Sequence, residues 1–507
     1  MRRLIVCCDG TWQSALFQEN PDRLTNISRL YAAINRQDER QSPPIEQVKL
    51  YLPGPGTGME LVSGVVSGAL GNGLLERVRE AYFWICHNYE NGDEGSQNFH
   101  SVFSLELELT LLLTFRRQIH LYGFSRGAYL VRLLSTLISL IGLLDPLSNL
   151  LPTIFSHLTS PRTSNTQRAR REQDELDRLL SSDEIRLRKE EQVRARKGGF
   201  LVQILGVFET VPLFHLHTLS PEHELLPIHN PFSLSDSDLE PEIEKTFQAL
   251  AMAEDRPSYV PVIYRHDSKI QGQELLQAWF PGFHSDVGGG GTDHELADLS
   301  LDWLIGHVES ELSINLDFIS SLSKRAIAPW GSHKPHAGFG SSLHHRPRHL
   351  PHGTDDTTFQ HFHQSLLEQN PLDLPADVRP LLEISDHELF LPLTRFEQEC
   401  KESWPVQPAV PIPDPLPLSE PTPPLDSPRL ITEAPTVFHP LPREEEEGEE
   451  KERKKTVTVT HSLAGHLRLR LGFRTVLNVE RELITGAREL HQKAAGAGIL
   501  PKDSRGR

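Results

Sequence analysis

The chain has 507 residues, of which 24% are charged, and its formal net charge at pH 7 is −18. This acidic excess argues against a nucleic-acid-binding protein, because phosphates require a basic surface. The four cysteines, two of them adjacent at Cys7 and Cys8, do not form a disulfide framework and favour a reducing, cytoplasmic setting.

The first predicted strand covers residues 4–8, and no signal peptide precedes it. It ends in Asp9-Gly10-Thr11, where the amide of Gly10 or of Thr11 can act as an oxyanion donor. We interpret Asp9 as a turn-former that hydrogen-bonds its own backbone. The alternative for Asp9 is a metal ligand acting together with Asp286.

The most informative motif is a Gly-x-Ser-x-Gly that runs from Gly123 to Gly127, between a short apolar run and a helical pattern. This setting is typical of a nucleophile elbow, in which a strand turns sharply into a helix and presents Ser125 at its tip. Side chains at Gly123 or Gly127 would crowd the turn or separate the strand from the helix. The amide of Arg126 then lies at a helix N-terminus and can stabilise an oxyanion. The alternative is a chance occurrence of the pattern in a loop.

The segment after the elbow, residues 129–144, is strongly apolar but contains Arg132. It is also shorter than the ~20 residues that span a bilayer. We therefore predict a buried core helix here and no transmembrane segment. Residues 160–198 are highly charged, which favours a polar helix or a disordered loop.

Ser125 needs a general base, and that base needs an orienting acid. Glu209 follows the buried strand predicted at 200–207, at the edge where catalytic groups of parallel sheets gather. His284 lies on a loop after the strand predicted at 276–280 and is soon followed by four glycines, which suits a general base. The order Ser125, Glu209, His284 is the one found in elbow hydrolases.

Each partner of the serine also has an ordinary explanation. A glutamate such as Glu209 is often a solvated strand end, and His284 is one of 25 histidines. We interpret Asp286 as a turn-former, rather than as the group that orients the imidazole or binds a cation. A metal-dependent hydrolase built on Asp9, Asp286 and His284 is a further alternative.

Together, these motifs resemble a widespread hydrolase-like family that includes phospholipase effectors of type VI secretion and many fungal members. The resemblance implies an α/β-hydrolase fold with a mostly parallel sheet flanked by helices, a triad of serine, aspartate and histidine, and activity on phospholipid esters. Nothing in the sequence calls for a cofactor. The resemblance extends from residue 3 to about 310 and is carried by Asp9-Gly10-Thr11-Trp12, Gly54-Pro55-Gly56-Thr57-Gly58, residues 123–129, 206–211 and 279–290.

The chain departs from the family pattern at several positions. Glu209 stands where the family has aspartate, and Gln248 and Ala253 replace a polar histidine and aspartate. Residues 95–118 separate the turn at 91–94 from the strand that directly follows it in the family. We interpret residues 95–118 as an insertion or as a retained intron.

We expect residues 1–325 to form the catalytic domain, with the charged segment 160–198 as an insertion in it. Residues 326–400 form a poorly defined extension, 401–455 a proline-rich and charged linker, and 456–507 a tail with one short helical pattern. We expect the linker and the tail to be disordered. The proline-rich part is a candidate site for a protein partner.

The sequence thus predicts a serine hydrolase that cleaves carboxylic esters through an acyl-enzyme, with Ser125, Glu209 and His284 as its triad. A lipid or phospholipid is the favoured substrate, and peripheral membrane contact would accompany it. The alternative is a hydrolase-fold protein that has lost catalysis and binds or scaffolds a partner.

Overall fold

The structure is a computed structural model, and the predicted insertion at 95–118 lies outside its described residues apart from Gln118. The proline-rich linker and the tail also lie outside them from residue 406 onward. The described residues are 2–11, 13–15, 23–55, 66–90, 118–159, 167–212, 237–256, 259–322, 326–336, 348–351, 355–374, 379–380 and 389–405.

Across the described residues, nine strands form one sheet in the order β2-β3-β1-β4-β5-β6-β7-β8-β9. Every neighbouring pair is parallel except β2 and β3. The predicted mostly parallel sheet is therefore confirmed. The strands are β1 (Arg2–Cys8), β2 (Gln37–Asp38), β3 (Ile45–Leu52), β4 (Gln118–Phe124), β5 (Val202–Phe208), β6 (Ile243–Ala251), β7 (Glu274–Phe280), β8 (Gln360–His363) and β9 (Phe390–Leu391).

The central strands are buried on both faces because helices cover both sides of the sheet. Every residue of β1 after Arg2 is buried, and so is every residue of β4 after Gln118. Continuous apolar runs of this kind are what a parallel sheet between two helical layers requires.

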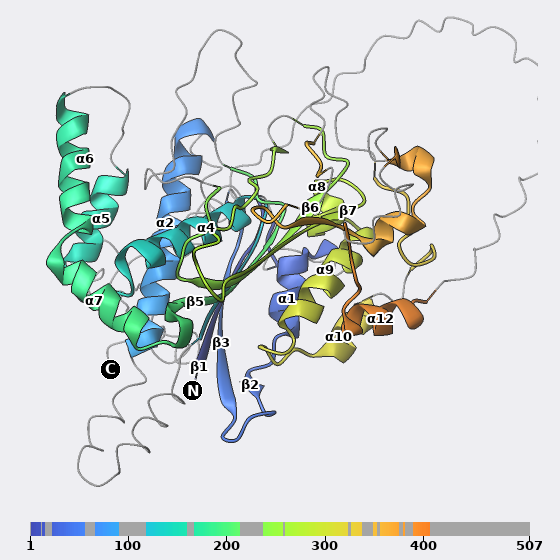
Figure 1. The fold of residues 1–507 in the computed structure, drawn as a ribbon, viewed down its shortest axis with the longest axis horizontal. Coiled ribbons are helices and arrows are strands. Elements are labelled where there is room, and N and C mark those ends of the chain that lie inside the picture. Colours follow the sequence, from blue (N-terminus) through green and yellow to red (C-terminus); the bar gives the residue numbers. More distant parts are fainter. Residues whose placement is uncertain are drawn as a thin grey trace, which may run out of the picture. The chain divides into compact units, whose positions relative to one another are not determined.

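Two helical layers enclose the sheet (Figure 1). One apolar core joins the sheet to α2 (Val66–Glu90), α4 (Arg126–Ile141), α5 (Leu150–Thr159), α6 (Gln167–Leu180) and α7 (Asp183–Arg194). The other core joins it to α1 (Asn26–Ala33), α9 (Glu295–Val308), α10 (Leu316–Leu322) and α12 (Arg395–Glu402). Shorter helical turns are α8 (His284–Gly288), η3 (Lys197–Gly199), η7 (Gln364–Glu368) and η8 (Pro371–Asp373).

The apolar segment after the elbow forms α4, a buried helix as predicted. Among the described residues, no helix combines the length and the apolar character needed to cross a bilayer. The charged insertion forms two helices in the described residues: α6, which packs beside α5, and α7, which contacts α4 (Figure 1). Leu176 and Ile185 of these helices are buried in the apolar core, and the partly buried Leu179, Leu180 and Val193 pack against it.

The prediction of a loop at His284 is wrong, because His284 is the first residue of α8. The local cause lies in the adjacent side chain. The Asp286 carboxylate accepts the amide of Phe283 at 2.8 Å, while the Phe283 carbonyl accepts the amides of Asp286 and Val287. These bonds close one helical turn immediately after β7.

The segment after residue 326 continues the same sheet. β8 pairs with β7, β9 pairs with β8, and α12 packs on α9. A third apolar cluster joins Trp279 of β7 to Leu350, Phe362 and Leu366. No pattern in the sequence marked these strands, because β8 and β9 contain only four and two residues.

Candidate active site

The candidate residues gather at one edge of the sheet because each follows the carboxyl end of a strand. Asp9 follows β1, Ser125 follows β4, Glu209 follows β5 and His284 lies four residues after β7. β3 and β4 lie on opposite sides of β1, so the strand order reverses there. Open parallel sheets bind ligands outside the strand ends at such a reversal.

Ser125 occupies a strained turn between β4 and α4. Its backbone angles are φ 57° and ψ −121°, a region that residues other than glycine rarely adopt. The Ser125 amide donates to the carbonyl of Phe208 at 3.0 Å, which extends the pairing of β4 with β5. The helix begins at the next residue, Arg126, so the serine lies at the junction that the motif predicts.

The two glycines of the elbow are in close contact with other backbone atoms. A Cβ atom at Gly123 would lie 2.6 Å from Cα of Ala128, and one at Gly127 would lie 2.3 Å from the carbonyl oxygen of Asp9. Any side chain at these positions would push α4 away from β4 and β1. The glycines therefore fix how closely the helix approaches the sheet.

Glu209 also adopts a left-handed conformation, with φ 48°, and its side chain is fully buried. Its Oε1 accepts the amide of Ala251 at 2.5 Å. Its Oε2 lies 3.1 Å from Nδ1 of His284 and accepts Nη2 of Arg348 at 2.8 Å. The turn that carries Glu209 is also hydrogen-bonded to the elbow, because the Val211 amide donates to the Ser125 carbonyl at 3.3 Å.

The imidazole of His284 is held on several sides. Its centroid lies 4.9 Å from that of Phe124, the residue before Ser125, and 4.7 Å from that of Tyr259, whose ring meets it edge-on. The His284 amide donates to Oε2 of Glu254 at 3.2 Å. Burial lowers the pKa of His284 below its usual value, although the contact with Glu209 opposes this effect. A neutral imidazole, able to accept a proton, is therefore favoured.

Arg348 is a part of the site that sequence reasoning missed. It is buried, and its Nε donates to the carbonyl of Glu254 at 2.9 Å while Nη2 bonds Glu209. Its Nη1 is buried without a hydrogen-bond partner in the described part of the chain. Arg348 lies in the extension predicted at 326–400, and no motif marks it.

The loop after β1 lies directly against the elbow. A Cβ atom at Gly10 would lie 3.2 Å from Cβ of Ser125. Asp9 holds this loop: its Oδ1 accepts the Gly10 amide at 2.9 Å, and its Oδ2 accepts the hydroxyls of Ser28 and Tyr51, each at 2.7 Å. Burial raises the pKa of Asp9. These contacts match the interpretation of Asp9 as a turn-former.

Asp286 does not contact the ring of His284 through any bond in the described structure; Glu209 does. Asp286 Oδ2 accepts the amides of Phe283 at 2.8 Å and of His336 at 3.2 Å, and Oδ1 bonds Nδ1 of His336. Among the described residues, the structure does not gather Asp9, Asp286 and His284 as a set of metal ligands.

Gln248 and Thr210 form hydrogen bonds next to the turn that carries Glu209. Thr210 donates to Oε1 of Gln248 at 2.9 Å, and Nε2 of Gln248 donates to Oε1 of Gln277 at 2.9 Å. Gln248, which replaces the family's histidine, therefore belongs to a buried hydrogen-bond network next to Glu209. Ala253, which replaces the aspartate, donates its amide to the carbonyl of Gly282 in the turn before His284.

Comparison with known proteins identifies one family over most of the sheet. The model of the T6SS phospholipase effector Tle1-like catalytic domain matches residues 2–307. This confirms the resemblance inferred from the motifs. No curated protein matches the chain.

Several solved structures are similar to the chain at low identity. An uncharacterized protein from Pseudomonas aeruginosa is 17% identical, with 59% of this chain and 44% of that chain covered and a TM-score of 0.30. The Tle1 effector bound to the VgrG spike of the type 6 secretion system is 19% identical, with coverages of 57% and 51% and a TM-score of 0.26. The RedJ thioesterase of prodiginine biosynthesis from Streptomyces coelicolor is 13% identical, with coverages of 59% and 88% and a TM-score of 0.21. The chain thus spans about half the length of the first two proteins.

Proposed function

Since the chain belongs to the family of Tle1-like phospholipase effector catalytic domains, we propose that it is a serine hydrolase that cleaves carboxylic esters of lipids or phospholipids. The observation that carries this proposal is the 3.1 Å contact between Glu209 and His284, beside a serine held in the backbone conformation of an elbow. Ser125 is the nucleophile, His284 the general base and Glu209 the acid that orients it.

The proposed reaction proceeds through an acyl-enzyme. Ser125 Oγ attacks the ester carbonyl carbon while His284 accepts the hydroxyl proton, and Glu209 stabilises the imidazolium that forms. The tetrahedral intermediate then collapses: the bond to the alcohol oxygen breaks, and His284 returns the proton to that oxygen. Water attacks the acyl-enzyme by the same proton route and regenerates Ser125.

Two backbone amides are proposed to hold the oxyanion. The amide of Arg126 lies in the first turn of α4, where N–H groups lack acceptors within the helix. For the second donor we favour Thr11 over Gly10, because the Gly10 amide already donates to Asp9. Nη1 of Arg126 donates to Oγ1 of Thr11 at 3.3 Å, which keeps the loop after β1 beside the elbow.

The test is labelling of the purified full chain with a fluorophosphonate probe, which reacts with activated serines. We expect labelling of the wild type and of Ser139→Ala, and none of Ser125→Ala. Ser139 is a matched control because it is a buried serine of α4 whose hydroxyl has no hydrogen-bond partner among the described residues. Failure of the folded wild type to react would overturn the proposal that this chain is an active serine hydrolase.

The class of substrate is determined in a separate experiment. Release of fatty acid from a diacyl phospholipid in vesicles is compared with hydrolysis of a short-chain ester in solution. Faster turnover of the phospholipid supports a lipid substrate and peripheral contact with a membrane surface. Turnover of the short ester alone would restrict the proposal to a soluble esterase.

One observation favours a second candidate function, a hydrolase-fold protein impaired in catalysis. Arg348 shares Oε2 of Glu209 with His284, and a guanidinium at this position weakens the interaction of the carboxylate with an imidazolium. If this second function is correct, the wild type does not react with the probe, whereas Arg348→Met, which removes the competing charge, does.

A further inference from the structure

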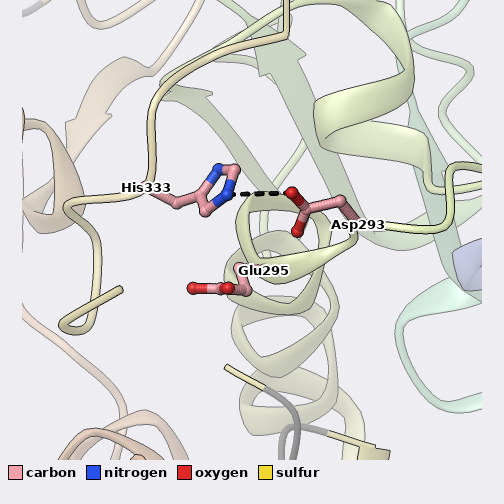
Figure 2. A group of neighbouring side chains, drawn as sticks. All are labelled: Asp293, Glu295 and His333. Carbon is pink, nitrogen blue, oxygen red and sulfur yellow. Dashed lines mark ion pairs between the residues drawn. The ribbon is translucent and has the colours of Figure 1, made fainter. Parts of the chain in front are cut away.

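A second group of ionisable side chains lies at the N-terminus of α9. Asp293 precedes α9, Glu295 is the first residue of α9, and His333 comes from the segment 326–336. One ligand atom from each lies within 4.8 Å of the other two. Figure 2 shows the imidazole of His333 pointing across to Asp293, with Glu295 below them at the start of the helix.

A fourth side chain, His336, faces the same group. Its Nε2 lies 3.8 Å from Oδ2 of Asp293, and Nε2 of His333 lies 3.0 Å from that same oxygen. Two imidazole nitrogens therefore converge on one carboxylate oxygen. On the other side of its ring, Nδ1 of His336 bonds the carboxylate of Asp286.

The bond between His336 and Asp286 is the arrangement typical of a histidine that ligates a metal. Such histidines donate the N–H of the second ring nitrogen to a carboxylate, which fixes the tautomer and orients the ring. In the metal-bound state the His336 proton would lie on Nδ1, which would leave the lone pair of Nε2 to face the ion beside Asp293.

We propose that Asp293, Glu295, His333 and His336 bind a divalent transition-metal ion, with zinc as the best fit. Two imidazoles and two carboxylates are ligands that zinc accepts in four-coordinate sites. Zinc–ligand bonds of about 2.1 Å place the ligand atoms of one ion roughly 3–4 Å apart. The spacing of up to 4.8 Å among Asp293, Glu295 and His333, and the 3.8 Å between His336 Nε2 and Asp293 Oδ2, therefore need only small side-chain rotations to close around the ion.

Glu295 anchors the proposed site to the segment that carries the histidines. It is buried, and its two oxygens accept the amides of Ile327 at 2.6 Å and Ala328 at 3.2 Å. Each carboxylate oxygen has a second lone pair, which is available to a metal. The ion would therefore fasten residues 326–336, which lie outside the family match, to the loop that precedes α9.

The site is structural rather than hydrolytic in this proposal. Asp286, the partner of His336, belongs to the same short helix as His284. The bound ion would thus stabilise the turn that carries His284 without touching substrate. The proposal does not depend on the assignment of Ser125, because its readout is metal binding.

The test measures zinc bound to the full-length protein, which is first stripped with a chelator and then dialysed against a zinc buffer. Metal is quantified by elemental analysis, and affinity by titration calorimetry. We expect Asp293→Asn, His333→Gln and His336→Gln each to lower the number of bound zinc ions by one or to weaken binding at least tenfold. Asp286→Asn should weaken binding about 10–100-fold, as expected for a residue that orients a ligand.

The matched control is His349→Gln, which removes an exposed histidine from a neighbouring segment outside the group. It should bind zinc as the wild type does. Circular dichroism of each variant establishes that it is folded, and the conservative changes to asparagine and glutamine limit the risk of misfolding. Equal stoichiometry and affinity in the wild type and all four variants would overturn the proposal, and so would a site that binds calcium but not zinc.

Discussion

The ends of β1 and β5 each carry a buried carboxylate, and the two acids have different partners. Asp9 is bonded by neutral groups, the amide of Gly10 and the hydroxyls of Ser28 and Tyr51. Glu209 is bonded by an amide, but also by Arg348 and His284, which are ionisable. Position at a strand end therefore does not decide the role of an acid. The role of each acid depends on the groups that donate hydrogen bonds to it. Neutral donors close to it in the sequence stabilise a turn, whereas an imidazole donor lets the carboxylate stabilise a charge that forms during the reaction.

The largest difference is expected when the carboxylate at the end of β1 or of β5 is replaced by an amide. Glu209→Gln should lower kcat about 10³–10⁴-fold, as loss of the acid does in other serine triads. Asp9→Asn should leave kcat within about tenfold of wild type, because Asp9 positions the oxyanion loop and does not itself touch the reacting atoms. The measurement is steady-state kinetics on an ester substrate. Equal losses in the two variants would contradict the distinction.

Substitutions at Arg348 test whether the ionic partner of Glu209 contributes to the stability of the fold. Arg348→Ala removes the charged donor of Glu209 and the Nε donor to the Glu254 carbonyl, and should lower the free energy of unfolding by about 3 kcal/mol. Arg348→Lys should recover only part of this loss, because an ammonium lacks the planar fork that reaches both acceptors. Urea unfolding of the three proteins provides the measurement. Full recovery by lysine would show that charge alone is required.

A smaller effect is expected on stability at the end of β1. Asp9→Asn replaces an acceptor with a donor facing the hydroxyls of Ser28 and Tyr51, and should cost about 1–2 kcal/mol of unfolding free energy. Ser28→Ala removes one of these donors and serves as a milder companion. Unchanged stability in Asp9→Asn would mean that the turn does not need the carboxylate.

The smallest effect is a shift in pH dependence. Burial lowers the pKa of His284, so the neutral base persists to lower pH than for an exposed histidine. The acidic limb of kcat/KM should therefore have its midpoint below about 6.5, the usual histidine value. The same midpoint is expected in Asp9→Asn, whose carboxylate does not contact the imidazole. A midpoint above 6.5 in the wild type would contradict this account of His284.

The sequence located the parts of the site that have local signals. Gly123 and Gly127 mark the turn at Ser125, and the apolar run before Glu209 marks a buried strand end. These features depend on residues within about ten positions along the chain, which periodicity and turn chemistry can reveal.

Other parts of the site depend on contacts across long separations in sequence. Arg348 reaches Glu209 across 139 residues from a segment without regular periodicity. His333 and His336 approach Asp293 from a similar irregular segment. No local pattern specifies which loop returns to which strand end, so these residues could not be predicted. The start of α8 at His284 was missed because a single side-chain cap, that of Asp286, produces it.

The apolar cluster shared by β7 and the residues after 348 bears on what counts as a transferable module. Trp279 lies inside the family match, whereas Leu350, Phe362 and Leu366, which pack in the same cluster, lie beyond its limit at residue 307. A piece cut at residue 307 would present an open hydrophobic surface to water and would also lack Arg348. The part of the chain matched by the family model is therefore shorter than the part that shares this apolar core. Fusion or transplantation of this domain should take residues 2–405 as its minimum length.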